Sequence, residues 1–396
     1  MINQKKQAFQ FIILLGVVSL FGDITYEGAR GVTGPYLRLF GASAVAIGLV
    51  AGLSEFVGYA LRLVSGYVAD KSEGYWALTI LGYGLILSIP VLGFAGSWQL
   101  AATLIILERM GKAIRSPARD TILSHATNVV GRGLGFGIHE ALDQVGAIIG
   151  PLVFSAVFLL EGSYRDGFRI LWLPAFLTLG ILLIAKRKAP VPVGFETQGK
   201  TPEKRLSKTF WLYSLFIFLS VAGFPSFLLI SYHFKAQAIV SDVHIPIFYA
   251  IAMGVDALSA VVVGKVYDKV GLKSLITIPL LTIFIPFLCF SQIYAYVLVG
   301  TVLWGAVVGT HETIMRAAIA DLTPITKRGT GYGIFNSTYG VAWFLGAPIM
   351  GLLYDLSISH VVGFVALLEL ISIPVLFSVN RSVALRGRQR GKAREW

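Results

Sequence analysis

The chain reads Gly264-Lys265-Val266-Tyr267-Asp268-Lys269-Val270-Gly271-Leu272-Lys273 where a long apolar segment ends. A shorter copy of this pattern, Gly66-Tyr67-Val68-Ala69-Asp70-Lys71, begins 198 residues earlier. Because the chain has 396 residues, each half carries one copy at a matching place. The spacing therefore predicts a duplicated architecture with two related halves.

The composition predicts that lipid, not water, surrounds most of the chain. Hydrophobic residues make up 56% and charged residues 14%, whereas soluble domains carry roughly 25% charged residues. The mean hydropathy is +0.75. The apolar runs are long and lack the alternation of barrel strands, so we expect helices. The predicted fold class is an all-α polytopic membrane protein.

Twelve apolar runs are long enough to span a bilayer as helices. They lie at roughly 9–37, 44–68, 76–96, 99–124, 133–159, 168–186, 209–233, 245–267, 273–292, 295–320, 330–353 and 361–379. A segment rich in Lys, Pro, Gly and Thr interrupts them at the midpoint, as a linker does. The predicted organisation is a six-helix half at 1–185, a linker at 186–208, a second six-helix half at 209–380 and a basic tail at 381–396.

The distribution of basic residues predicts the orientation. With the N-terminus inside, cytoplasmic segments hold 21 of the 33 Lys and Arg residues, external segments hold 4, and the spans hold 8. Cytoplasmic loops are enriched in Lys and Arg, so we expect a multi-pass protein of the cytoplasmic membrane with both termini cytoplasmic. The net charge of +12 then reflects topology, and we expect no nucleic-acid partner. The single cysteine, Cys289, excludes an intramolecular disulfide.

The repeated motif gives the chain a family resemblance. Gly-x-x-x-Asp-(Arg/Lys)-x-Gly-x-(Arg/Lys) after the second helix, with a copy after the eighth, is typical of the major facilitator superfamily, which this chain resembles over nearly its full length. The first copy here loses the later basic residues. The resemblance implies two pseudo-symmetric six-helix bundles and a cytoplasmic gate. The gate residues would be Gly66, Asp70, Lys71, Gly264, Asp268, Lys269, Gly271 and Lys273.

The fifth predicted helix carries a second element of the resemblance. Gly146-Ala147-Ile148-Ile149-Gly150-Pro151 is similar to a motif associated with exporters of that family. Its small residues Gly146 and Gly150, followed by Pro151, also suit close helix packing. Arg109 in the fourth helix matches an arginine that many family members place there.

Charged residues inside the spans are the candidate functional groups, because each costs about 2.5–3.5 kcal/mol near the bilayer centre. In the first helix, the i, i+4 spacing places Asp23 and Glu27 on one face. Two nearby carboxylates suit a proton carrier. The alternative is a structural pair between Glu27 and Arg30. Tyr26 adjoins these charges and is a candidate cavity residue.

The fourth and fifth helices carry further charges. Arg109 and Lys112 either pair with acids on the first and fifth helices or bind an anionic substrate group. Arg115 and Arg119 approach the cytoplasmic end, where we expect lipid headgroups or loops to contact them. A proton shuttle is the interpretation for the fifth helix, since histidine titrates near neutrality. Its members are His139, Glu140 and Asp143.

The second half carries a similar His-Glu pair at His311 and Glu312, followed by Arg316. The second histidine of the zinc-protease motif is missing, so metal hydrolysis is not expected. His139, Glu140, His311 and Glu312 remain candidate ligands of a transported divalent metal. Asp256 lies in the eighth helix without a nearby cation in sequence, and Glu55 lies in the second helix.

These patterns predict a secondary transporter that works by alternating access and is not an enzyme. The favoured function is a proton-coupled antiporter that exports a small organic compound. The alternatives are a divalent-metal exporter, an uptake symporter for an anionic solute, and, outside transport, a membrane enzyme with a His-Glu site. We expect no cofactor, a monomer, and three partners: substrate, protons and the bilayer. The proton-coupling candidates are Asp23, Glu27, His139, Glu140, Asp143 and Asp256; the cavity candidates are Tyr26, Arg30, Glu55, Arg109, Lys112, His311, Glu312 and Arg316.

Overall fold

A computed structural model describes residues 2–130, 132–188, 206–323 and 328–392, and all regular structure in these ranges is helical. The first half contains α1 (Ile2–Leu39), α2 (Ala44–Ser72), α3 (Tyr75–Gly84), η1 (Leu85–Leu87), α4 (Ser88–Val91), η2 (Leu92–Phe94), α5 (Trp98–Val130), α6 (Arg132–Leu159), α7 (Tyr164–Ile170) and α8 (Trp172–Lys188). The second half contains α9 (Lys208–Ala222), α10 (Phe227–Ala236), α11 (His244–Val270), η3 (Gly271–Ile276), α12 (Thr277–Thr282), α13 (Phe284–Cys289), α14 (Tyr294–Leu322), α15 (Arg328–Leu356) and α16 (Ile358–Lys392).

The twelve predicted spans are confirmed. Ten described segments are long and apolar enough to cross a membrane. One of them, His244–Cys289, holds two successive spans, because α11 is followed by the η3–α13 segment. The twelfth span is α5, whose 33 residues are long enough to cross a bilayer. It is not among the ten apolar segments because its charged side chains interrupt the apolar stretch.

Proline explains why several spans are broken into shorter helices. In the span Tyr75–Phe94, Pro90 lies in the short helix α4, between the two 3-10 turns η1 and η2. Pro225 separates α9 from α10, and Ser226 then caps α10 by accepting from the amide of Leu229. The free carbonyl of Pro225 accepts a 2.8 Å hydrogen bond from the Trp304 indole. Proline removes a backbone donor, so neighbouring side chains must satisfy the exposed carbonyls.

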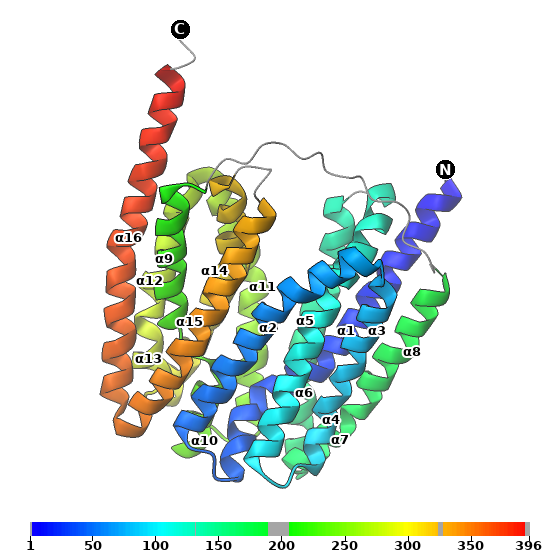
Figure 1. The fold of residues 1–396 in the computed structure, drawn as a ribbon. Helices are drawn as coiled ribbons and strands as arrows, with labels where there is room; N and C mark the ends of the chain where they lie inside the picture. The colour runs from blue at the N-terminus through cyan, green and yellow to red at the C-terminus, as the bar shows by residue number, and fades with distance from the viewer. Residues whose placement is uncertain (1, 131, 189–205, 324–327, 393–396) are drawn as a thin grey trace.

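The helices form two bundles (Figure 1). The first half forms one and the second half the other, while α2 and α15 cross where the bundles meet. Across this contact, the rings of Phe56 and Phe344 lie 5.3 Å apart, and those of Tyr59 and Tyr339 lie 4.7 Å apart. Both termini lie at the same end of the molecule, which we call the terminal end (Figure 1).

The predicted packing motif lies where α6 crosses α1. A Cβ at Gly146 would lie 2.4 Å from the Leu20 carbonyl oxygen, and one at Gly150 would lie 2.6 Å from that of Ile24. Real Cβ atoms do not approach so closely. Glycine therefore allows the two backbones to touch, and Pro151 follows within the same helix.

The halves are joined at the end opposite the termini. Four hydrogen bonds cross between them there: Arg38 to Tyr232 (3.0 Å), Tyr164 to Asp242 (2.7 Å), Ser155 to the Val243 carbonyl (2.8 Å), and the Val45 amide to Asp355 (3.3 Å). At the terminal end, by contrast, the first half has an apolar core of its own. Phe11, Tyr75, Trp76 and Leu123 belong to it, and its buried members all come from the first half.

The two connecting regions are described only in part. Of the predicted linker at 186–208, residues 189–205 lie outside the described residues, while Lys186 to Lys188 end α8. The predicted tail begins inside α16, which continues as helix to Lys392, and residues 393–396 lie outside the described part.

Candidate functional site

A cavity of about 260 Å³ lies between the two halves. Its walls come from α1, α2, α4, α5 and α6 on one side, and from the segment between α9 and α10 together with α10, α11, α14 and α15 on the other. The lining reaches Asp120, in the last third of α5, and Glu140, in the first third of α6. Both of these parts of the helices lie toward the terminal end of the molecule (Figure 1). It includes none of the four hydrogen-bonded contacts that join the halves at the opposite end. The cavity therefore sits on the terminal-end side of that closure.

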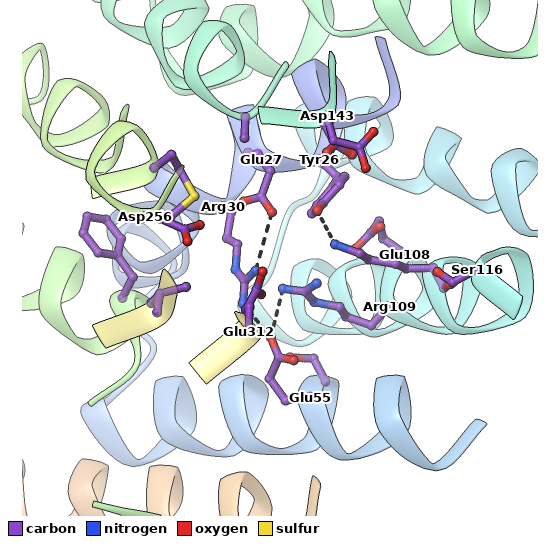
Figure 2. A pocket seen from close by; sticks show the side chains of 18 of the residues that line it. Tyr26, Glu27, Arg30, Glu55, Glu108, Arg109, Ser116, Asp143, Asp256 and Glu312 are labelled. Atoms are coloured by element: carbon purple, nitrogen blue, oxygen red, sulfur yellow. Dashed lines mark hydrogen bonds and ion pairs between the residues drawn. The ribbon is translucent and has the colours of Figure 1, made fainter. Parts of the chain in front are cut away.

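Figure 2 shows ion pairs from three helices of the first half meeting at the centre of the cavity. Glu55 on α2 accepts from Arg30 on α1 at 2.5 Å and from Arg109 on α5 at 3.0 Å. Arg30 also lies 3.6 Å from Glu27, one turn away on α1. One carboxylate thus holds two guanidinium groups, which ties together helices that are distant in sequence.

Two tyrosines complete this central network. Tyr249 on α11 donates its hydroxyl to Glu27 and so connects the second half to the charges of the first. Lys112 on α5 donates to the hydroxyl of Tyr26, and its ammonium lies 4.1 Å from the centre of the same ring. The contact of Lys112 is thus to a neutral side chain, and no acid that the structure describes lies within 4.0 Å of its ammonium.

A second polar network lies closer to the terminal end of the first half. Arg119 on α5 donates to Ser19 at 3.1 Å and pairs with Asp120 at 2.8 Å. Asp143 on α6 lies 4.0 Å from Arg119 and 3.5 Å from His139. These distances connect α1, α5 and α6 through side chains that the sequence analysis treated separately.

Arg115 differs from the expectation that it contacts headgroups or loops. Its side chain is 3% exposed and pairs with Glu108, two helical turns away, at 3.5 Å. It also donates to the carbonyl of Gly82 at 3.5 Å. The sequence spacing could not show that α3 packs closely enough against α5 to cover this side chain.

The structure brings most of the predicted site residues to one cavity. Those that line it are Asp23, Tyr26, Glu27, Arg30, Glu55, Arg109, Lys112, Glu140, Asp143, Asp256, Glu312 and Arg316. His139 and His311 are absent from the lining. His311 is 1% exposed and lies 3.4 Å from the Tyr339 hydroxyl.

The candidate metal ligands do not form one cluster. His139 and Glu140 belong to the first half, whereas His311 and Glu312 belong to α14. No group of three His, Cys, Asp or Glu side chains within the described ranges could hold a metal ion.

Several lining residues were not singled out from the sequence. Trp304, Phe224, Phe227 and Met253 line the cavity from the second half. Apolar side chains in an apolar span carry no signal of their own, because packing residues look the same. Arg62 also lines the cavity, with its guanidinium 5.0 Å from the ring centre of Tyr59.

The two copies of the repeated motif end α2 and α11 at the terminal end. Gly66 and Lys71 lie in the last turns of α2, and the side chain of Asp70 lies outside the described part. Asp268 and Lys269 are exposed at the end of α11, and Gly271 has a φ of +61°, which favours glycine. Lys273 follows in η3. Tyr267, inside the second copy, donates to Asp321 at 2.6 Å.

Two six-helix bundles that enclose a charged cavity at their interface define a class of protein, the secondary transporters. Family comparison gives the particular family. The model of the Major Facilitator Superfamily matches residues 12–290 and, in a second match, 211–395. The chain belongs to this family.

Relatives match this chain over nearly its whole length. A protein of Mycobacterium tuberculosis strain H37Rv, described as uncharacterized, is 41% identical over 382 residues, covering 94% of this chain and 93% of the relative. An uncharacterized MFS-type transporter of Methanocaldococcus jannaschii is 30% identical over 375 residues, covering 91% and 92%.

Solved structures share the fold at low identity. A bacterial homolog of the human lysosomal transporter Spinster, in an inward-facing and unoccupied conformation, aligns with a TM-score of 0.72 and 14% identity, covering 95% of this chain and 97% of that one. The nucleoside transporter NupG aligns with a TM-score of 0.70 and 13% identity, covering 94% and 98%.

Proposed function

We propose that this secondary transporter is a proton-coupled antiporter that exports a small organic compound from the cytoplasm. The observation that carries the proposal is a set of cavity carboxyl groups without fixed counter-charges. Asp23, Glu140 and Asp256 line the cavity, and none forms an ion pair with a residue that the structure describes. Such an acid takes up and releases a proton without breaking an ion pair.

Glu27 has a different role in this proposal. It accepts from Tyr249 and lies 3.6 Å from Arg30, so its charge is held by both halves. Protonation of Glu27 would weaken a contact between the bundles. Proton uptake at the unpaired acids and release of the Glu27 contact would then be coupled to the relative motion of the halves.

The position of the cavity relative to the closure supports alternating access. The halves are hydrogen-bonded at the end opposite the termini, and the cavity lies on the terminal-end side. With the cytoplasmic termini that the Lys and Arg distribution predicts, this arrangement would be the inward-facing state. Export would require the opposite-end contacts to break after the substrate and protons exchange.

Sealed proteoliposomes containing a pH-sensitive dye test this function. A pH gradient is imposed, and lipophilic cations, organic anions and divalent metals are then added separately. We expect proton movement on addition of an organic class, and loss of that movement in the triple variant Asp23→Asn, Glu27→Gln, Glu140→Gln. A triple variant that retains full pH-driven transport, while binding substrate normally, would show that protons do not use these acids.

The same experiment separates the alternatives. Divalent metals alone moving protons would favour the metal exporter, and substitution of both His139 and His311 should then abolish the response. Organic anions accumulating inside with protons would favour the uptake symporter, in which Arg109 and Lys112 hold the anion. Lys112→Arg should then bind substrate better than Lys112→Ala.

A further inference from the structure

The two walls of the cavity differ in chemistry. Of the 16 charged side chains that line it, 13 come from the first half and 3 from the second. Aromatic side chains show the reverse distribution, with 2 from the first half and 6 from the second. A ligand that fits both walls therefore needs charged groups and an apolar body.

In the central network of the first-half wall, cations outnumber acids, although the wall as a whole carries seven acids and six cations. Three cations, Arg30, Arg109 and Lys112, face two acids, Glu27 and Glu55, which form the ion pairs of this network. Glu55 is shared by both guanidinium groups, so neither has an acid to itself. Lys112 uses one donor on the Tyr26 hydroxyl, and an ammonium group has three. This part of the wall has donors left for an anionic group.

The second-half wall carries a carboxyl group that has no ion-pair partner among the described residues. Asp256 on α11 is 4% exposed and lines the cavity. It makes no hydrogen bond or ion pair through its side chain with the residues in the described ranges. Three other acids, Glu27, Glu140 and Glu312, line the same cavity. A buried carboxylate among acids needs a cation or a proton.

The surface beside Asp256 is apolar and aromatic. Tyr249 and Met253 precede it on α11 by about two turns and one turn, and both line the cavity. The ring centres of Tyr249 and Trp304 lie 6.2 Å apart, and those of Phe227 and Trp304 lie 5.2 Å apart. Aromatic faces of this kind bind planar or apolar groups and attract cations.

We infer that the cavity binds a small zwitterion with an apolar or aromatic body. Its anionic group would contact Lys112 and Arg109, its ammonium group would contact Asp256, and its body would pack against Trp304. The volume of about 260 Å³ lies just below the range of roughly 300–1,000 Å³ that is usual for ligand cavities, so the ligand is small. The inference rests on the proposed function, in which the ligand of this cavity is the transported compound.

Binding to the purified full-length protein in detergent tests the ligand class without any gradient. The probes are two sets of three: tryptophan, tryptophanamide and indolepropionate, and phenylalanine, phenylalaninamide and phenylpropionate. Each set compares a zwitterion with ligands that lack one charge. Calorimetry and thermal unfolding should show millimolar or tighter binding of a zwitterion, with at least about ten-fold weaker binding when either charge is removed.

Variants then test which wall of the cavity contacts each charged group of the ligand. Asp256→Asn should weaken binding of the zwitterion to the level of its deaminated partner and leave that partner unchanged. Lys112→Gln should weaken binding of the zwitterion but not of the amide. Glu369→Gln is the matched control, because Glu369 is a fully buried acid of the second half that is absent from the cavity lining.

Three results would overturn the inference. The first is that a deaminated or amidated ligand binds the unmodified protein as tightly as the zwitterion does. The second is that Asp256→Asn weakens the binding of all three ligands equally. The third is that no probe binds at millimolar concentration. The comparison on the unmodified protein does not depend on any variant folding. Zwitterion binding without proton movement would instead contradict the coupling alone.

Discussion

Glu55 is the side chain on which the central charges depend. It holds Arg30 at 2.5 Å and Arg109 at 3.0 Å, and the two cations come from different helices. A guanidinium group does not lose its proton in proteins. If the carboxylate is removed, both positive charges remain in the cavity and repel each other across it.

We therefore expect Glu55→Gln to lower the stability of the protein by about 1–3 kcal/mol, because the pairs are partly accessible to water. We also expect it to slow substrate exchange at least about ten-fold. Thermal unfolding in detergent and exchange in proteoliposomes measure the two effects. Glu161→Gln removes an exposed acid from the loop after α6 and should change neither. A Glu55→Gln protein as stable and active as this control would contradict the role of Glu55.

Gly150 gives a second prediction for a single residue. A Cβ there would lie 2.6 Å from the Ile24 carbonyl oxygen and 2.7 Å from the Gly28 amide nitrogen. We expect Gly150→Ala to destabilise the protein by about 1–3 kcal/mol, because α1 and α6 must move apart. Gly180→Ala on α8 is the control, since a Cβ there meets no atom within 4 Å. Equal unfolding temperatures for the two variants would show that the helices separate without cost.

At the level of the helices, the sequence predicts the spans better than it predicts the contacts between them. The spans themselves could be predicted, because long apolar runs and proline positions are local features. The ion-pair partners that lie on different helices could not be predicted. Glu55 and Arg109 are 54 residues apart, and no spacing rule connects them. Trp304 was missed for another reason, since a cavity-lining aromatic and a packed one have the same sequence pattern.

The closure opposite the termini depends on contacts between α7 and the segment before α11. Asp242 pairs with Lys235 at 2.6 Å and accepts from Tyr164 of the other half at 2.7 Å. Asp242→Ala removes the link between halves and should shift the protein toward the state open at that end. Contacts that water can reach contribute about 0.2–1 kcal/mol, which corresponds to a population change of roughly 1.4- to five-fold.

Thiol labelling measures this shift. Ser155, whose hydroxyl donates to the Val243 carbonyl across the closure, is replaced by Cys in a Cys289→Ser background. We expect Asp242→Ala to speed reaction with a membrane-impermeant reagent by about 1.4- to five-fold. Asp166→Ala is the control, because the hydrogen bonds and the ion pair that Asp166 forms within the described part of the chain are to Ser163 and Arg169 of its own half. An equal labelling rate in both variants would exclude Asp242 from the closure.

For the whole molecule, the common end of the two termini (Figure 1) makes the orientation testable. We expect a fluorescent protein fused after Trp396 to be bright and alkaline phosphatase fused there to be inactive, because both termini are predicted to be cytoplasmic. Alkaline phosphatase inserted after Glu161, in the loop at the opposite end, should be active. The reverse pattern would invert the orientation and, with it, the direction in which the cavity opens.

The unequal walls of the cavity have a consequence for hydration. Ionised side chains keep water near them, whereas an aromatic surface releases it. A solute entering between the bundles would lose its water shell on the side that faces Trp304 and keep contact with solvent near Arg109 and Lys112. Dehydration would then proceed one face at a time, so the solute would never have to shed its whole shell in a single step.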